Sequence, residues 1–250
     1  MKRFENQVAI ITGGARGIGQ AIGHRIAQEG GIVYLLDVLA KTVEATAHQL
    51  RQEGYPATGL EVDITDEAAV KRVVQEVMKE NGRIDILVNC AGIIGLTATK
   101  ITDYDLATFQ QVHQVNVIGA FLITKYVIGH MEKAAYGRIL HISSIGGKEG
   151  NPGMVGYAAS KSGLMGLVKG VGKEFADKGI TVNGLAPAVI ATPMNQDTDK
   201  AMLDYMASKI PMGRLGTVDE AAAISCWIVS KEASFNTGFI FDLSGGRATF

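Results

Sequence analysis

Short apolar runs alternate with amphipathic segments along most of the chain. The runs are rich in Val, Ile and Leu and are bounded by Gly, Pro, Asn or Asp, which is typical of buried β-strands. They cover residues 7–12, 32–36, 59–62, 84–89, 138–142, 180–185 and 239–243. Between them, apolar residues recur every three or four positions, as in helices packed on a core. We expect helices over 17–29, 43–52, 66–80, 105–132, 155–177 and 219–229, with an irregular stretch over 193–215 that contains a Met-rich helical piece.

Strands that alternate with helices predict a parallel sheet that is covered on both faces. Right-handed crossovers then give an α/β, doubly wound, Rossmann-type sheet of about seven strands. The chain has 250 residues, enough for one large core, and we find no linker, low-complexity tract or internal repeat. We therefore expect a single domain over residues 1–250.

Composition and charge exclude several classes of protein. With 47% hydrophobic and 20% charged residues, the chain is not intrinsically disordered. A formal net charge of −1, without a basic patch or an aromatic stacking motif, predicts no nucleic-acid partner. No signal-peptide core and no run of 18 apolar residues occurs, so no membrane partner is expected. The prediction is a soluble cytoplasmic protein.

The cysteines and histidines do not indicate a metal site. Cys90 and Cys226 each lie within an apolar stretch, where a free thiol packs as a small hydrophobic side chain. The five histidines are not clustered at ligand spacing, and we interpret them as surface or packing residues.

A glycine-rich turn, TGGARGIG over residues 12–19, joins the first strand to the first helix. Glycines there permit a tight turn and let backbone N–H groups approach a pyrophosphate at the helix N-terminus. The spacing of Gly13, Gly17 and Gly19 is G-x3-G-x-G, which differs from the usual dinucleotide fingerprint. At this point a turn that binds no ligand remains an alternative.

Asp37 ends the second strand, 18 residues after Gly19. A carboxylate there can hydrogen-bond a ribose 2′-hydroxyl and repel a 2′-phosphate, which favours NAD over NADP. Arg16 points the other way, because a guanidinium in the turn can bind a 2′-phosphate. We give the carboxylate more weight because its charge would directly face the phosphate. The alternative for Asp37 is a helix N-cap.

Tyr157 and Lys161 are four residues apart, so they share one face of a helix, and Ser144 precedes them by thirteen residues. A nearby ammonium favours the ionised form of a phenol. If Lys161 and a cationic cofactor lower the pKa of Tyr157 to about 7, they supply about 4 kcal/mol of differential stabilisation. Tyr157 then serves as a general acid or base. A Tyr and a Lys at this spacing also occur by chance on exposed helices.

Other polar or small residues follow the remaining strands. Asp63 follows the third strand, Asn89 through Gly92 the fourth, and Pro187 the sixth. Ligands of open α/β sheets bind outside the carboxyl ends of the strands. The convergence of these residues with Asp37 and Ser144 predicts one ligand site at that edge.

Together these residues resemble the short-chain dehydrogenase/reductase family over essentially the whole chain. The matching motifs are Thr12-Gly13-x3-Gly17-Ile18-Gly19, Asp63, Asn89-x-Ala91-Gly92, Asn116, Ser144, Tyr157-x3-Lys161, and Pro187 with Thr192. Two positions depart from the family pattern: Cys90 replaces an Asn and Ala188 replaces a Gly. Neither Cys90 nor Ala188 takes part in the chemistry. The two departures leave only the detailed geometry of cofactor binding undetermined.

The resemblance implies a nicotinamide cofactor and roles for individual residues. Tyr157 would exchange the proton, Ser144 would orient the substrate oxygen, and Lys161 would hold the nicotinamide ribose and tune Tyr157. Asn116 would support a water in a proton relay, and its alternative is a capping or kink residue in the long helix. The implied cofactor contacts are Gly13, Arg16, Gly17, Ile18, Gly19, Asp37, Asp63, Ile64, Asn89, Ala91, Gly92, Tyr157, Lys161, Pro187, Val189, Ile190 and Thr192.

Substrate and assembly are predicted more coarsely. The polar segment 147–151 should line the pocket, and Met194, Met202, Met206 and Met212 either cover it or pack as ordinary helix residues. The C-terminal stretch with Arg247 is similar to tails of family members acting on 2-keto-3-deoxy sugar acids, and a surface ion pair is the alternative for Arg247. The resemblance also implies a homotetramer, formed partly by the helices at 105–132 and 155–177. Glycines 163, 166, 170 and 172 would let helices approach closely there.

Our leading hypothesis is an NAD-dependent dehydrogenase that interconverts a secondary alcohol and a ketone on a small polar hydroxy-acid, sugar acid or polyol. The alternative in the same class is an NADPH-dependent 3-oxoacyl-thioester reductase. Asp37 and the near-neutral charge speak against it. A nucleotide-binding protein without turnover is a third interpretation, disfavoured because Ser144, Tyr157 and Lys161 are all present.

Overall fold

The structure, a computed structural model, describes residues 2–192 and 200–248. Within these ranges seven strands form one sheet in the order β3-β2-β1-β4-β5-β6-β7, and every neighbouring pair is parallel. The doubly wound α/β prediction is therefore confirmed. The strands are β1 (Val8–Thr12), β2 (Ile32–Asp37), β3 (Ala57–Glu61), β4 (Ile86–Asn89), β5 (Gly137–Ile142), β6 (Ile180–Pro187) and β7 (Ile240–Leu243).

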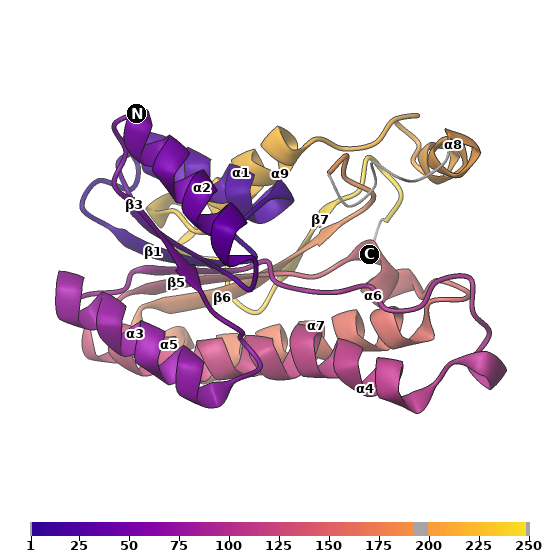
Figure 1. The fold of residues 1–250 in the computed structure, drawn as a ribbon, viewed down its shortest axis with the longest axis horizontal. Coiled ribbons are helices and arrows are strands. Elements are labelled where there is room, and N and C mark those ends of the chain that lie inside the picture. Colours follow the sequence, from indigo (N-terminus) through magenta and orange to yellow (C-terminus); the bar gives the residue numbers. More distant parts are fainter. Residues whose placement is uncertain (1, 193–199, 249–250) are drawn as a thin grey trace.

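Helices cover both faces of the sheet (Figure 1). One face carries α1 (Gly17–Gln28), α2 (Ala40–Gln52) and α9 (Val218–Ile228), and the other carries α3 (Glu67–Asn81), α5 (Ala120–Lys133) and α7 (Val155–Glu174). Every residue of the central strands β1, β4, β5 and β6 is buried, because both of their faces pack against helices. This explains why apolar residues dominate these strands instead of alternating with polar ones.

The long helix expected over 105–132 has an irregular centre. The chain forms α4 (Leu106–His113), a π-helical segment η2 (Gln114–Gly119) and then α5. A β-carbon at Gly119 would lie 2.6 Å from Ile64 Cδ1, so the segment passes very close to the loop after β3. Apolar periodicity does not reveal such a widened turn, which often occurs at functional sites.

The helix over Leu106–Lys133 is long and apolar enough to pass a composition test for a membrane span. Half of its apolar window is buried within the protein. Ile123, Val127 and Met131 belong to the core against the sheet, so packing accounts for much of its apolar character.

Two short helices lie near the carboxyl edge of the sheet, and the remaining segments are 3-10 turns. The helix α6 (Ile145–Glu149) was not predicted, whereas α8 (Lys200–Ser208) is a helical piece inside the stretch 193–215, as expected. The helix expected over 155–177 ends at Glu174 and continues as the turn η3 (Ala176–Lys178). The other turns are η1 (Ile101–Asp103) and η5 (Lys231–Ala233).

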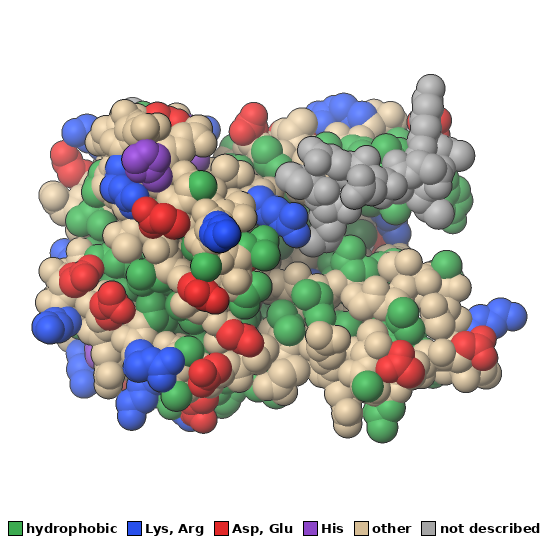
Figure 2. Space-filling model, in the orientation of Figure 1, with side chains coloured by type: hydrophobic (Ala, Val, Ile, Leu, Met, Phe, Trp, Pro, Cys, Tyr) green, Lys and Arg blue, Asp and Glu red, His purple; other side chains and the backbone are tan. Residues whose placement is uncertain are grey.

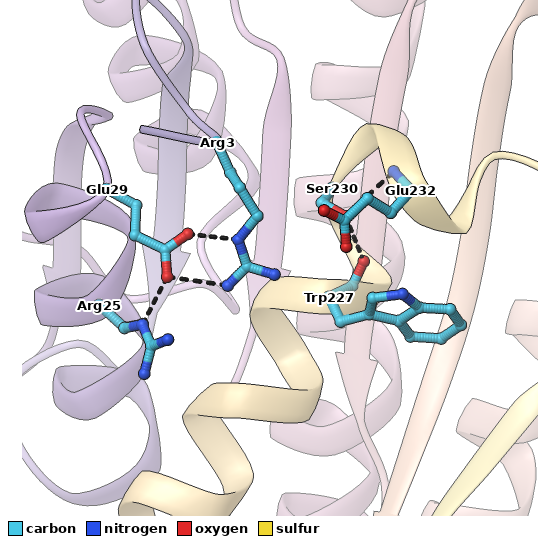
Figure 3. A network of polar contacts seen from close by, with 6 residues as sticks. All are labelled: Arg3, Arg25, Glu29, Trp227, Ser230 and Glu232. Carbon is cyan, nitrogen blue, oxygen red and sulfur yellow. Dashed lines mark hydrogen bonds and ion pairs between the residues drawn. The ribbon is translucent and has the colours of Figure 1, made fainter. Parts of the chain in front are cut away.

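An ion-pair network anchors the N-terminal segment to the end of α1 (Figure 3). Glu29 accepts hydrogen bonds from both Arg3 and Arg25. Burial opposes ionisation of Glu29, but the two guanidinium groups outweigh it and hold its pKa below the usual range. The network therefore stabilises the attachment of the N-terminal segment to the fold.

Candidate active site

The predicted site residues gather where the strands end. The surface is hollowed on the same side of the molecule as α6 and α8 (Figure 2). Asp37 is the last residue of β2, and Asn89 is the last residue of β4. Ser144 lies two residues after the end of β5, and Ala188 directly follows β6. The parallel strands bring these positions to one edge.

The glycine turn packs on itself and on the end of β4. Gly13 has a φ of +66°, and a β-carbon there would lie 2.8 Å from the Ala91 nitrogen. A β-carbon at Gly19 would lie 2.2 Å from the Gly13 carbonyl oxygen. The N-cap of α1, Arg16, makes no side-chain hydrogen bond to the helix end. The free N–H groups of the first turn therefore fit an anion such as a pyrophosphate.

Asp37 lies beside this turn and hydrogen-bonds two backbone amides. Its carboxylate accepts from the Ala15 N–H at 3.1 Å and from the Leu39 N–H at 3.1 Å. The N-cap of α2 is Leu39, so the alternative of Asp37 as the helix N-cap is wrong. The carboxylate fixes the turn and places a negative charge next to it, while Arg16 is exposed.

Thr12 and Asn89 connect the ends of β1 and β4. The Thr12 hydroxyl donates to Asn89 Oδ1 at 2.6 Å and accepts from the Ala91 N–H at 3.2 Å. Asn89 Nδ2 is a buried donor with no partner among the described residues. Thr12 is part of the family motif, but we did not include it among the candidate site residues. The feature that could have identified it is a hydroxyl at the end of an otherwise apolar strand.

Asp63 and Ile64 form the corner after β3. Asp63 Oδ1 accepts hydrogen bonds from the backbone N–H and the hydroxyl of Thr65, at 2.8 and 2.7 Å. Ile64 is buried against Gly119. The corner lies next to the π-helical segment that carries Asn116.

Lys161 and Tyr157 share one face of α7, as predicted. Lys161 Nζ lies 5.8 Å from the centroid of the Tyr157 ring and donates to the Ile142 carbonyl oxygen at 2.8 Å. The lysine is 4% exposed, and burial lowers its pKa to about 8. The ammonium is thus held beneath the phenol by the end of β5.

The pKa of Tyr157 in this structure lies above its ordinary value. Burial of the phenol raises the pKa, and a hydrogen bond from Ser144 opposes that effect. The lowering to about 7 that we expect from Lys161 and a cationic cofactor stays a prediction.

Ser144 is the N-cap of α6, and its hydroxyl oxygen accepts the Gly146 N–H at 3.1 Å. The hydroxyl proton therefore remains to be donated, either to Tyr157 or to a substrate oxygen. Ser143 donates to the Lys161 carbonyl oxygen at 3.0 Å and ties the end of β5 to α7.

Asn116 is 1% exposed and joins three segments. Its side chain accepts from the Ile93 N–H at 2.8 Å and donates to the Ile93 carbonyl at 2.9 Å and to Ser160 Oγ at 2.9 Å. A β-carbon at Gly92 would lie 3.1 Å from Asn116 Oδ1 and 3.3 Å from Lys161 Nζ, so these groups are neighbours. We had not singled out Ser160, whose signal is a serine directly before Lys161 in the helix.

The residues after β6 run toward the glycine turn. Val189 and Ala191 exchange backbone hydrogen bonds with Gly216, and a β-carbon at Gly17 would lie 3.8 Å from Thr192 Cβ. Ile190 is buried. A cavity of about 670 Å³ lies between α1, α2 and α9 beside Thr192, and Tyr157 is not part of its lining. Met194 and the side chain of Met202 lie outside the described residues.

Arg247 forms an ion pair, which was the alternative in the sequence analysis. Its guanidinium donates to Glu149 Oε2 at 2.7 Å and to Asn151 Oδ1 at 3.3 Å. Lys148, one residue before Glu149, pairs with Asp242 at 2.8 Å. The segment after Ser144 therefore contacts the C-terminal segment through charged side chains.

Comparisons with known proteins identify the family of the chain. A family model described as short chain dehydrogenase matches residues 7–203. The 2-dehydro-3-deoxy-L-rhamnonate dehydrogenase (NAD(+)) of a Sphingomonas species is 41% identical over 99% of this chain and 98% of that protein. A 3-oxoacyl-acyl-carrier-protein reductase of Thermotoga maritima is 37% identical over 98% of each. The structure of an NAD+-bound xylitol dehydrogenase matches with a TM-score of 0.93 and 30% identity, covering 98% of this chain and all of the other. This chain belongs to the short-chain dehydrogenase family and is an oxidoreductase that acts on CH–OH groups.

Proposed function

We propose that this protein oxidises a secondary alcohol of a small polar hydroxy-acid, sugar acid or polyol to a ketone, with NAD as the hydride acceptor. The observation that carries this proposal is the meeting of Tyr157, Ser144 and Lys161 at the end of β5. A phenol, a hydroxyl donor and a buried ammonium form a proton-exchange site.

Each polar group has a separate task in the proposed reaction. When bound, NAD supplies the acceptor for the hydride that leaves the carbinol carbon. Tyr157 accepts the hydroxyl proton as the C=O bond forms, and Ser144 donates a hydrogen bond to the same substrate oxygen. Lys161 holds the nicotinamide ribose, and its positive charge favours the phenolate form of Tyr157. Asn116 supports a water that carries the proton onward.

The cofactor contacts are proposed along the carboxyl edge of the sheet. Backbone amides of the turn 13–19 hold the pyrophosphate at the start of α1. Asp37 accepts the ribose 2′-hydroxyl and disfavours a 2′-phosphate, in line with the NAD(+) in the name of the Sphingomonas relative. The other proposed contacts are Asp63, Ile64, Asn89, Ala91, Gly92, Pro187, Val189, Ile190 and Thr192.

A sugar acid is the favoured substrate class. The support is the 41% identity with a dehydrogenase of 2-dehydro-3-deoxy-L-rhamnonate, together with the charged segment 148–151 next to Ser144. Reduction of a 3-oxoacyl thioester with NADPH is the second candidate, favoured by the 37% identity with the Thermotoga reductase. Asp37 argues against it because of the 2′-phosphate of NADPH.

We also propose a single-domain cytoplasmic homotetramer that binds neither nucleic acid nor membrane. Ile118 and Phe121 are exposed apolar side chains near α7, and Gly166 and Gly170 of α7 have open space where a side chain would be. A second copy packed there would cover these groups. Gly172 does not contribute, because it packs against Gly238 within the chain. Sedimentation velocity checks the assembly, and a monomer would overturn it.

The proposed reaction is tested by formation of NADH from NAD, or of NADPH from NADP, with a panel of 2-keto-3-deoxy sugar acids, polyols, hydroxysteroids and 3-hydroxyacyl thioesters. We expect turnover with NAD and a sugar acid or polyol, and turnover lower by about 1,000-fold for Tyr157→Phe. Turnover restricted to NADP and acyl thioesters would instead establish the second candidate.

A further inference from the structure

The outer side of α6 is held by four charged residues, Lys148, Glu149, Asp242 and Arg247, which we call the C-terminal clamp. Lys148 pairs with Asp242 of β7, and Glu149 pairs with Arg247 of the tail. The Arg247 and Glu149 side chains are only 17% and 26% exposed, so the pair is partly shielded from water. The clamp joins the segment after Ser144 to a part of the chain about 100 residues away.

The opposite side of α6 rests on the helix of Tyr157 and Lys161. A β-carbon at Gly147 would lie 2.8 Å from the Lys161 carbonyl carbon, and Ser162 Oγ donates to the Gly147 carbonyl oxygen at 2.5 Å. The short helix therefore lies between α7 and the C-terminal segment. With only five residues, it has little stability of its own and depends on both neighbours.

A continuous series of contacts leads from the clamp to the Ser144 hydroxyl. Arg247 donates to Asn151 Oδ1. A β-carbon at Gly146 would lie 2.8 Å from Asn151 Nδ2, so the Asn151 amide covers Gly146. The Gly146 N–H is the group that donates to Ser144 Oγ. Loss of Arg247 thus releases Asn151, then the first turn of α6, and then the orientation of the serine hydroxyl.

We propose that Arg247 and Glu149 are positioning residues that orient Ser144 for the reaction through Asn151 and Gly146. This proposal rests on the proposed function only in assigning a catalytic task to Ser144. The clamp touches neither Asp37 nor the glycine turn in the contacts described, so cofactor affinity should be independent of it.

The test uses the full-length Arg247→Met variant. At saturating NAD and saturating alcohol substrate from the panel, we expect kcat to fall about ten-fold, because small displacements of a reacting group are costly. The Kd for NADH should stay within about two-fold of wild type, since the glycine turn is untouched. The amides of 145–151 should exchange hydrogen faster. The matched control is Arg51→Met, which removes the Arg51–Glu44 ion pair on α2 and should change none of these quantities.

A charge swap, Glu149→Arg with Arg247→Glu, separates positioning from general destabilisation. It restores the ion pair, and the new carboxylate at position 247 can accept from Asn151 Nδ2 where Arg247 donated to Oδ1, so we expect it to recover most of the lost kcat. A wild-type kcat in Arg247→Met, unchanged exchange over 145–151, or a folded swap variant with no recovery would each overturn the proposal. If Arg247→Met does not fold, the swap variant decides by the same criteria. An inactive wild-type protein would contradict the proposed function. Hydrogen exchange of the amides of 145–151 would still show whether Arg247 holds α6 in place.

Discussion

The two halves of the candidate site are built by different means. On the side of β1 and β2, the chain approaches itself through backbone atoms, as at Gly13 and Gly19, where no side chain would fit. On the side of β5 and α7, side chains hold the structure: Lys161 binds the end of β5, Asn116 bridges three segments, and the C-terminal clamp holds α6.

The difference suggests a division of tasks: the side of β1 and β2 binds the cofactor, and the side of β5 and α7 carries out the proton exchange. A backbone cradle recognises a phosphate group that all nicotinamide cofactors share, so it needs glycine and little else. A proton-exchange site needs a particular pKa, which depends on burial and on neighbouring charges. We therefore expect substitutions on the β1 side to affect cofactor affinity, and substitutions on the β5 side to affect turnover or its pH dependence.

The largest expected effect is in Tyr157→Phe. The ring is retained and the hydroxyl that accepts the proton is removed, so kcat should fall about 1,000-fold. Titration with NADH should give a Kd close to that of wild type. If the variant loses NADH binding to the same extent as turnover, the division between the two halves is wrong.

His141 should make the protein sensitive to acid. It is fully buried on β5, and burial lowers its pKa to about 3. In the unfolded chain the pKa returns to about 6.5, so the unfolded state binds an extra proton between these values. The free energy of unfolding should therefore decrease by up to about 4 kcal/mol as the pH falls from 6.5 to 3.

Denaturant titrations of wild type and His141→Gln at a series of pH values check this expectation. The variant should show a smaller loss of stability over the same range, whatever its stability at pH 7. Parallel curves for the two proteins would show that His141 is not the group responsible.

Gly19→Ala should disturb the glycine turn on the β1 side of the site. The added methyl group would lie 2.2 Å from the Gly13 carbonyl oxygen, so the turn must shift. We expect a loss of about 2 kcal/mol in the free energy of unfolding and a marked loss of NADH affinity. Gly129→Ala serves as a control for the loss of a glycine, because that position in α5 has open space and its φ is not positive. An NADH affinity equal to wild type in Gly19→Ala would contradict the role of the turn.

The smallest effect is expected for Asp37→Asn. The amide oxygen can still accept one backbone N–H, but the negative charge is gone. The ratio of kcat/KM for NADP to that for NAD should rise about ten-fold, equivalent to 1.4 kcal/mol. An unchanged ratio would mean that cofactor choice is set elsewhere, and Arg16 would be the next position to vary.

The sequence predicts the half built from backbone more completely than the half built from side chains. Glycine spacing and apolar runs located the turn, all seven strands and the edge at which they end, because these features depend on local sterics and burial. The π-helical segment at 114–119 and the short helix α6 were missed because both depend on long-range packing, against Ile64 and against the C-terminal segment. An ion pair was the alternative for Arg247, but its partner could not be named, because Glu149 lies 98 residues earlier.

The most direct test of the account is transfer of the hydride itself. Wild-type protein would be incubated with NAD and a sugar acid or polyol from the panel, deuterated at its secondary carbinol carbons, and the NADH analysed by mass spectrometry. We predict NADH that carries one deuterium, formed by the wild type and not by Tyr157→Phe. NADH without deuterium, or equal formation by both proteins, would contradict hydride transfer coupled to proton acceptance by Tyr157.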